Sequence, residues 1–571
     1  DCLLSRGLGD VYKRQGILHV RAYIHEERRY LSLNILLVGL NIDRRNCMKI
    51  IPFSDLKDIV KEGDVIALAA LSTANLPAEI LKTLVEQYDE DQSLNNLTFM
   101  LANDISDYRG DSYDLDSFVS RGMVKRLITS IITGSPATIQ AMQNNEIEAY
   151  FLPQGVITTH YRGSTEAFPG PITKIGLNTN VDPRYSGGKV NTCTTEDLVS
   201  LININDNTYL KYQFPEIDVA LLRGTYADEA GNIYMKHETH LGEGFSLAAA
   251  THKNNGKVIV QVKEVIQSGR FNPNEVFIPG KLVDYIVVNR DPKYHRQVIQ
   301  TYYDPALSGH YQITEMREPY IELNTRKVIL RRAAQFLLQG DVISIGFGIN
   351  NELSNVLTEE GVNNLVQPNI DTGVFGGLIS SGKNFGMNYN LSARMRHDMT
   401  WDFIYNGGVD IAFLSFAQVD SMGNVNVSKF GNKMNGCGGF IDISQTVKTI
   451  VFSGSLVVGG QLSYEQRKVN VEQEGHIPKF INEIDNIDFN VENAFLLEQE
   501  IYFVTERAVF ELTQQGLMLI EIAPGLDLER DILANMEFKP LIATHLKEIN
   551  SDIYQDKWGG LSDAIKSDYR I

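Results

Sequence analysis

The stretch Pro368–Gly377 combines one carboxylate with three glycines. Its pattern predicts a buried strand that ends at Asp371, followed by a turn that contains Gly373, Gly376 and Gly377. A strand fixes the side chain at its carboxyl end, and glycines let a ligand approach backbone N–H groups. Asp371 is therefore the first candidate for a catalytic group, although an aspartate that only caps a turn gives the same pattern.

A second glycine-rich stretch, Asn435–Asp442, follows a short predicted strand. A loop with three glycines exposes several N–H groups, which suits an oxyanion or a phosphate. A purely structural turn is the alternative.

A third stretch, Gly346–Asn351, lies between a predicted strand and a predicted helix. Gly346 and Gly348 begin a dinucleotide-binding pattern, and Asp371 follows about 20 residues later, where a ribose-binding acid would lie. Asn351 replaces the third glycine, so a tight strand-to-helix turn is favoured over a nucleotide site.

The His237–His240 stretch, with a glutamate between two histidines, could suggest a metal site. It lacks the spacing of a zinc-binding helix, and we expect a surface loop there. The sequence contains neither a nucleophile-elbow motif nor a phosphate-binding P-loop.

Two similar halves must position these groups. The same four residues, Gly-Asp-Val-Ile, begin a predicted strand at Gly63 and at Gly340. A longer pattern that begins with Asp218 and contains Gly231 recurs without a gap, at the same offset, with Asp410 and Gly423. Strands that alternate with helices imply parallel sheets with crossover helices.

The expected fold is therefore α/β, with two similar open, mostly parallel α/β domains in tandem. Their predicted limits are residues 48–310 and 325–571, and Asp218 and Asp410 should lie on equivalent strands. Residues 1–47 differ in character from the regular sequence after Met48, and we expect them to be a non-native leader.

Length, charge and cysteine content limit the functional classes. A chain of 571 residues is too long for one core, and a hydrophobic content of 43% is typical of a soluble globular protein. The net charge of −19 argues against nucleic acid or an anionic membrane as the main partner. Cys193 and Cys437, the cysteines outside the leader, form no disulfide pattern, which fits a reducing cytoplasm.

Taken together, these segments resemble the class I CoA-transferases of the fused acetate/propionate/acetoacetate type, close to Gram-positive bacterial members. The resemblance runs from Met48 to about Lys557, and its most specific motifs are Asp182–Asn191, Leu222–Thr225, Asp228–Ile233, Asn424–Ser428, Asn435–Ser444, Thr505–Phe510 and Ile520–Asp527. The first half is similar to the α part of the family and the second half to its β part.

The resemblance implies a covalent mechanism, in which an enzyme carboxylate takes CoA from an acyl-CoA and passes it to a second acid. It implies Asp371 as nucleophile and Gly438 as oxyanion donor. Gly346, Gly348, Gly376, Gly377, Asn435, Gly436 and Gly439 are the expected CoA-binding residues. No separate cofactor or metal is expected, and the expected partners are acyl-CoA, short-chain carboxylic acids and further copies of the chain, as a homodimer or homotetramer.

One position departs from the family, whose nucleophile is a glutamate where this chain has Asp371. Glu352, at the start of the helix after Gly348, is the rival nucleophile. The alternative functions are a CoA-binding protein without turnover, a sugar-phosphate isomerase of similar fold, and a dinucleotide-binding enzyme. The duplicated half argues against the isomerase.

Overall fold

The computed structural model describes residues 49–106, 113–165, 168–314, 320–380 and 384–566. By its contacts the chain divides into two compact units, Asp1–Cys47 and Met48–Ile571. The predicted leader lies outside the described residues, and everything below concerns the second unit. In the described segments, no helix combines the length and the apolar character needed to cross a membrane.

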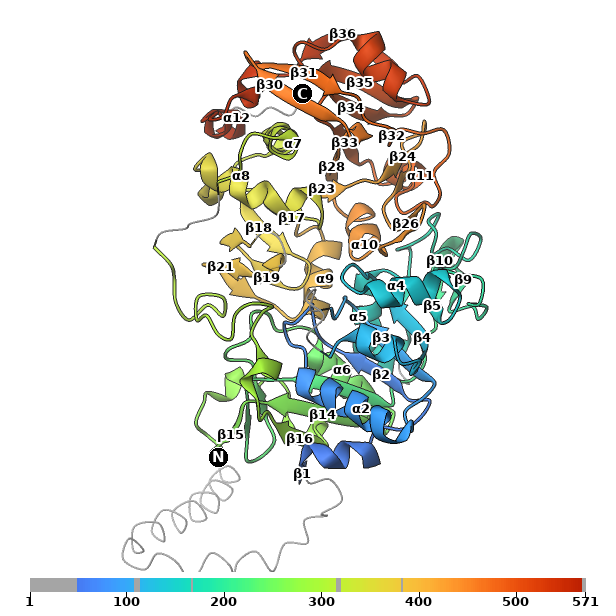
Figure 1. The fold of residues 1–571 in the computed structure, drawn as a ribbon, viewed down its shortest axis with the longest axis vertical. Coiled ribbons are helices and arrows are strands. Elements are labelled where there is room, and N and C mark those ends of the chain that lie inside the picture. Colours follow the sequence, from blue (N-terminus) through green and yellow to red (C-terminus); the bar gives the residue numbers. More distant parts are fainter. Residues whose placement is uncertain (1–48, 107–112, 166–167, 315–319, 381–383, 567–571) are drawn as a thin grey trace, which may run out of the picture. The chain divides into compact units, whose positions relative to one another are not determined.

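The first half is built on a sheet of eight parallel strands (Figure 1). Their order across the sheet is β1 (Lys49–Ile50), β16 (Tyr285–Val288), β14 (Lys257–Val262), β11 (Val219–Arg223), β2 (Val65–Leu68), β3 (Leu97–Leu101), β4 (Val124–Thr129) and β5 (Glu148–Phe151). The helices of this half are α2 (Ala78–Asp91), α3 (Leu115–Val119), α4 (Pro136–Gln143), α5 (Gln154–Gly163) and α6 (Gly244–Lys253). Strands such as β11 are buried along their whole length because a parallel sheet is covered on both faces.

The second half contains a sheet of ten strands, of which the middle five are parallel. The order is β22 (Ala393–Arg394), β19 (Val374–Phe375), β18 (Gln367–Ile370), β17 (Val342–Ile345), β23 (Ile411–Ser415), β28 (Thr449–Ser453), β33 (Glu500–Val504), β34 (Ala508–Thr513), β35 (Gly516–Ile522) and β36 (Leu541–Glu548). Its helices are α7 (Thr325–Ala333), α8 (Leu353–Glu359), α9 (His397–Tyr405), α10 (Phe440–Ser444), α11 (Val491–Leu496) and α12 (Leu561–Lys566).

The remaining strands form small sheets and hairpins beside these two sheets. They are β6 (Ser164–Thr165), β7 (Phe168–Pro169), β8 (Ile172–Thr173), β9 (Val199–Ile204), β10 (Asn207–Tyr212), β12 (Tyr226–Asp228), β13 (Ile233–Tyr234), β15 (Glu264–Ile266), β20 (Leu378–Ile379), β21 (Asn388–Tyr389), β24 (Gln418–Val419), β25 (Val425–Asn426), β26 (Lys429–Phe430), β27 (Lys433–Met434), β29 (Val457–Val458), β30 (Gln461–Glu465), β31 (Lys468–Gln473) and β32 (Ile477–Pro478).

The two halves repeat the same topology, which confirms the expected pair of open α/β domains in tandem. The order β16-β14-β11-β2-β3 in one sheet matches β33-β28-β23-β17-β18 in the other. Asp218 and Asp410 lie before the equivalent strands β11 and β23, as predicted. The Asp218 carboxylate accepts a hydrogen bond from Val65 N–H at 2.9 Å, and the Asp410 carboxylate accepts one from Val342 N–H at 2.8 Å. The exact domain limits stay a prediction.

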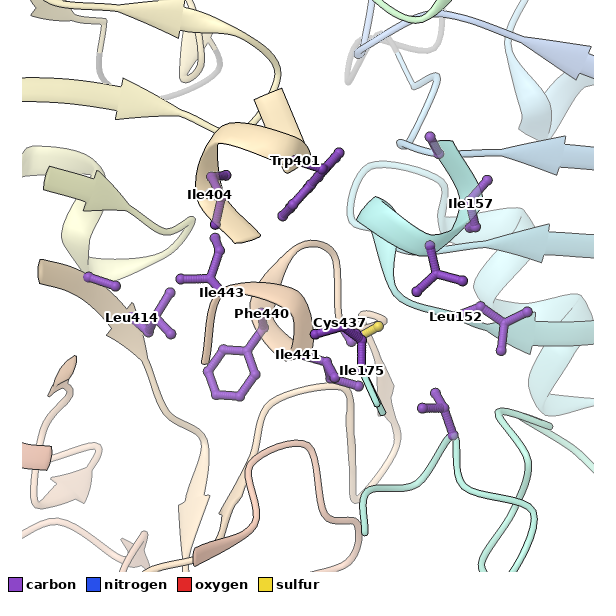
Figure 2. Packing of buried hydrophobic residues seen from close by; sticks show 14 of the residues in the cluster. Leu152, Ile157, Ile175, Trp401, Ile404, Leu414, Cys437, Phe440, Ile441 and Ile443 are labelled. Carbon is purple, nitrogen blue, oxygen red and sulfur yellow. The ribbon is translucent and has the colours of Figure 1, made fainter. Parts of the chain in front are cut away.

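One hydrophobic core crosses from the first half into the second (Figure 2). Leu152, Ile157 and Ile175 of the first half belong to the same buried cluster as Trp401, Ile404, Leu414, Cys437, Phe440, Ile441 and Ile443 of the second. Two further clusters lie almost wholly within one half each. The glycine-rich stretch around Cys437 is therefore packed from both sides.

Candidate active site

Asp371 directly follows β18, so a fully paired strand holds its backbone. The turn after it closes with a hydrogen bond from Gly373 N–H to Ile370 O at 2.8 Å. Gly373 has a φ of +102°, and an added methyl group there would lie 2.3 Å from Met395 O, so this position requires glycine. The turn thus places the carboxylate firmly, and the side chain remains partly exposed.

The loop Asn435–Gly439 is fastened to the first half of the chain by three backbone hydrogen bonds. Asn435 O accepts from Ile132 N–H at 2.7 Å, Gly438 N–H donates to Ser130 O at 2.8 Å, and Gly438 O accepts from Gln154 N–H at 3.1 Å. An added methyl group on Gly439 would lie 2.7 Å from Asp371 Oδ2 and 2.7 Å from the Trp401 ring. The loop therefore reaches the carboxylate, and residues of both halves form the site.

A cavity of about 1230 Å³ opens in front of these two elements. Seven of the nine residues that the sequence assigned to the site line it: Gly346, Gly348, Asp371, Asn435, Gly436, Gly438 and Gly439. The strand ends of the second half thus converge on one cavity, as the α/β architecture predicts. The functional roles of these residues stay predictions.

Gly376 and Gly377 do not line the cavity. A methyl group on Gly376 would lie 2.5 Å from Ser392 Oγ, and one on Gly377 would lie 1.9 Å from Tyr389 O. Packing against the neighbouring strands explains both glycines, and the structure does not bring them together with Asp371 and the loop.

The turn of the incomplete dinucleotide pattern and the rival carboxylate Glu352 both have structural explanations. Gly348 N–H donates to Asn351 Oδ1 at 3.0 Å, which closes the strand-to-helix turn of the incomplete dinucleotide pattern. Glu352, the rival nucleophile, does not line the cavity, and its Oε1 lies 3.4 Å from Arg326 Nη1.

The expectation of a surface loop at His237–His240 is wrong. Glu238, Thr239 and His240 are buried, and Glu238 Oε2 lies 2.5 Å from the guanidinium of Arg223, which is equally buried. The error arose because the sequence does not show Arg223 as the partner that lets this glutamate lie inside. Within the described ranges, no group of three or more His, Cys, Asp or Glu residues could hold a metal ion.

Burial raises the pKa of Asp371 above its ordinary value, while the charge of His397 and the N–H of Thr372 oppose this rise. Burial also raises the pKa of Asp442 to about 7. The Asp442 carboxylate accepts hydrogen bonds from Tyr405 O–H at 2.7 Å and Gly155 N–H at 3.1 Å. With a pKa this high, Asp442 can hold a proton near neutral pH, so Asp371 and Asp442 need not both carry a negative charge.

Three residues that the sequence did not indicate belong to this region: Gln154, His397 and Glu243. Gln154 lines the cavity, and its amide lies 2.9 Å from His397 Nε2. His397 Nδ1 lies 2.8 Å from Glu243 Oε2. A usable signal existed for Gln154, because Gln154-Gly155 lies in the turn beyond the carboxyl end of β5, where α5 begins. His397 and Glu243 carry no such signal, since only the fold brings them together.

Comparisons with known proteins agree with this geometry. A family model described as coenzyme A transferase matches residues 55–289, and a model of the malonate decarboxylase alpha subunit matches residues 189–401. Caffeate CoA-transferase of Acetobacterium woodii is 37% identical over 522 residues, which make up 90% of this chain and 99% of that protein. Acetate CoA-transferase YdiF of Escherichia coli K12 is 36% identical over 478 residues, or 84% and 89% of the two chains.

The crystal structure of acyl-CoA transferase YdiF from E. coli O157:H7, in a thioester complex with CoA, matches with a TM-score of 0.83 and 33% identity. The match covers 90% of this chain and 97% of that one. These matches cover 84–90% of this chain. The chain belongs to the coenzyme A transferase family and is a CoA-transferase.

Proposed function

We propose that this enzyme transfers CoA between short-chain acyl-CoA and a free monocarboxylate, and that Asp371 carries CoA between the two half-reactions. The observation that carries the proposal is the contact between the Asp371 carboxylate and Gly439 at the wall of the large cavity. A nucleophile beside a glycine loop is the arrangement that acyl transfer requires.

In the first step, an oxygen of the Asp371 carboxylate attacks the thioester carbon, and CoA thiolate leaves. The product is a mixed anhydride between the acyl group and Asp371. The thiolate then attacks the aspartyl carbonyl, the free acid leaves, and CoA remains bound to Asp371 as a thioester. A second acid reverses these steps, so that the energy of the thioester is not lost to water.

An N–H of the glycine loop would stabilise the oxyanions that form in these steps. The N–H of Gly438, our first choice from the sequence, donates to Ser130 O in the structure. In the part of the chain that the structure describes, the N–H of Gly439 has no hydrogen-bond acceptor, and Gly439 lies against Asp371. We therefore favour Gly439 as the donor. One such donor lowers the activation free energy by roughly 3–4 kcal/mol.

The lining of the cavity supports a monocarboxylate rather than a dicarboxylate. Apolar side chains, among them Leu71, Val298 and Met387, line it together with the Asp371 turn. Among the described lining residues, only Lys433 and Lys479 are basic. Lys479 already donates to Phe416 O at 3.0 Å, and burial lowers its pKa to about 8. Acetate, propionate, butyrate and acetoacetate fit this lining, and acetate and caffeate are named for the relatives.

Asp371→Asn tests the nucleophile directly. Incubation of the unmodified enzyme with acyl-CoA should add the mass of CoA to the peptide that contains Pro368–Gly377. Asn keeps the shape but lacks the anionic oxygen, so the variant should lose both the adduct and CoA exchange. Mass spectrometry of the digested protein measures the first effect, and an exchange assay with a panel of acids measures the second.

Glu352→Gln is the matched control, because it removes the rival carboxylate and should leave the label in place. A label that survives Asp371→Asn and disappears in Glu352→Gln would assign the reaction to Glu352. Tight binding of CoA without any label or exchange would indicate a CoA-binding protein instead.

The proposal extends to the setting of the enzyme. Cys193 and Cys437 are free thiols, which supports a reducing cytoplasm. A homodimer or homotetramer remains our expectation from the family resemblance.

A further inference from the structure

We propose that the buried pair Glu243–His397 sets the orientation of the Gln154 carboxamide, and that this orientation determines whether the cavity offers a hydrogen-bond donor to the acceptor carboxylate. Gln154 and His397 belong to opposite halves of the chain and meet beside Asp371. The inference rests on CoA transfer to a carboxylic acid as the reaction of this cavity.

The three side chains form one buried line. Glu243 precedes α6, His397 begins α9, and Gln154 begins α5. Each is at most 2% exposed. Their backbones are tied together as well, because His397 N–H donates to Gly242 O at 3.1 Å and Gln154 N–H donates to Gly438 O at 3.1 Å. The imidazole therefore has the Glu243 carboxylate and the Gln154 amide as its hydrogen-bond partners.

The Gln154 amide lies between the imidazole and the cavity. Its nitrogen is 2.9 Å from His397 Nε2. Its oxygen points to the glycine loop, 3.9 Å from where a methyl group on Gly438 would lie. A half-turn of the amide exchanges the two ends at little steric cost, since they have almost the same shape.

The proton on His397 decides which end faces the imidazole. Glu243 beside Nδ1 keeps a proton on that nitrogen. A neutral imidazole then has a lone pair at Nε2 and accepts from the amide NH₂, so the amide oxygen faces the cavity, as in this structure. An imidazolium has an N–H at Nε2 and requires the amide oxygen as acceptor, so the NH₂ group faces the cavity.

Only the second orientation offers a donor to an anionic acid. An amide NH₂ hydrogen-bonds to a carboxylate, whereas an amide oxygen repels it. The charged state of His397 therefore favours binding of the free acid, and the neutral state disfavours it.

The groups around His397 place its titration in a measurable range. Burial alone would lower the pKa of His397, but Glu243, Asp371 and Asp398 together raise it above the ordinary value of 6.5. Burial lowers the pKa of His240 to about 3, so that side chain is neutral nearby. The other titratable or charged groups on the packed segments are Glu238, Arg394, Arg396, Tyr161, Tyr405 and Asp442.

The sign of the pH dependence follows. Below the pKa of His397 the donor is present, and it is lost as the pH rises through that pKa. The KM for acetate at saturating acyl-CoA should therefore be constant at low pH and rise above the midpoint. Above about pH 6 acetate is almost fully ionised, so over that range it adds no titration of its own.

Glu243→Gln and Gln154→Ala test this account. Glu243→Gln removes the carboxylate that stabilises the imidazolium, so the midpoint of the KM profile should move to lower pH by about one unit or more. Gln154→Ala should raise KM for acetate roughly tenfold at low pH, the lower end of what a hydrogen bond to a charged group contributes, and should abolish the alkaline rise. Thr251→Val is the matched control, because Thr251 is buried on α6, the helix that Glu243 precedes, and its hydroxyl donates to Leu247 O within that helix.

NMR titration of the His397 imidazole supplies a measurement that needs no turnover and separates this inference from the proposed function. The acceptor acid binds the enzyme–CoA thioester, in which Asp371 carries no charge, so the titration is made on that adduct. The inference predicts that the KM midpoint equals the pKa of His397 in the adduct and moves with it in Glu243→Gln. It is overturned if the pKa moves and the KM midpoint stays, or if Gln154→Ala keeps the alkaline rise. Absence of exchange with every acid tested would overturn the proposed function and would leave the NMR result as the test of the pair.

Discussion

The family resemblance implies a glutamate at the position of Asp371. An aspartate is one carbon shorter, and the shorter side chain brings a different neighbour into reach. The N–H of Thr372 lies close enough to the Asp371 carboxylate to oppose the rise of its pKa. The amide nitrogen next along the chain therefore lies beside the carbon that would carry CoA. From an aspartyl carbonyl, attack by this nitrogen closes a five-membered ring.

We expect a slow side reaction when acyl-CoA is supplied without an acceptor acid. Thr372 N attacks the aspartyl thioester, CoA leaves as the thiol with the amide proton, and a succinimide remains. The protein should then lose activity while its mass falls below that of the unmodified chain by one water. Mass spectrometry over several hours measures this change.

Asp371→Glu is the control for ring closure, because the same attack would require a less favoured six-membered ring. If the unmodified enzyme lost activity at the same rate as Asp371→Glu and gave no dehydrated peptide, this account would be contradicted. Full stability of the CoA adduct would show that the turn holds Thr372 N away from the carbonyl.

At the scale of single elements, the segment from His237 to Glu243 connects two parts of the site. Glu238 binds Arg223 at the end of β11, and Glu243 binds His397 at the start of α9. Burial opposes ionisation of Glu238, but Arg223 beside it holds the pKa of Glu238 well below its ordinary value of 4.5. The segment therefore depends on an ionised, fully buried carboxylate.

Glu238→Gln should lower the free energy of unfolding by about 3–5 kcal/mol, because it leaves the buried guanidinium of Arg223 without its counter-ion. The pKa of Glu238 is lower in the folded than in the unfolded state, so its contribution is present above pH 4.5 and is lost as the pH falls below that value. Urea unfolding at pH 7 and at pH 4 measures the difference from the unmodified protein.

Glu196→Gln serves as a surface control, since Glu196 pairs with Arg126 but is 55% exposed. It should change stability little. A Glu238→Gln protein as stable as this control would show that Arg223 finds other acceptors.

The sequence predicts elements better than it predicts contacts between them. The strands predicted to begin at Gly63 and Gly340 form as β2 and β17, each beginning two residues later, and the strand predicted to end at Asp371 forms as β18, which ends at Ile370. Periodicity and turn residues determine such local features. Burial of Glu238 and the pairing of His397 with Gln154 depend on residues far apart in the chain, so no local pattern reports them. Gly376 and Gly377 do not reach the cavity although they follow Asp371 closely in the sequence. Closeness in sequence does not determine which residues the fold brings together.

At the scale of the whole molecule, the junction between the halves shapes the site. Gly436 forms a β-bridge with Ile131, and an added methyl group would lie 2.3 Å from Ser130 O. There is no space at this contact for any other residue. The loop can therefore keep its position only while the two halves stay in register.

Gly436→Ala should reduce CoA exchange by about a hundredfold or more, because a shift of about 1 Å in a catalytic group can have that effect. Gly407→Ala is a matched control, since Gly407 also has a positive φ, of +80°, but it does not line the cavity and an added methyl group there meets nothing within 4 Å. Initial rates, with thermal unfolding as a check on folding, compare the two. Equal activity of both variants would show that the contact with Ser130 is dispensable.

The three backbone hydrogen bonds that fasten loop 435–439 to residues 130–154 have a further consequence, which concerns assembly. Both partners of this contact belong to one polypeptide, so its closure is unimolecular. The effective concentration of one half around the other is therefore set by the connecting chain, at about the millimolar level for a short flexible connection. Dilution cannot separate the loop from the strand ends that hold it, and the fraction of complete catalytic centres is the same in a dilute as in a concentrated solution.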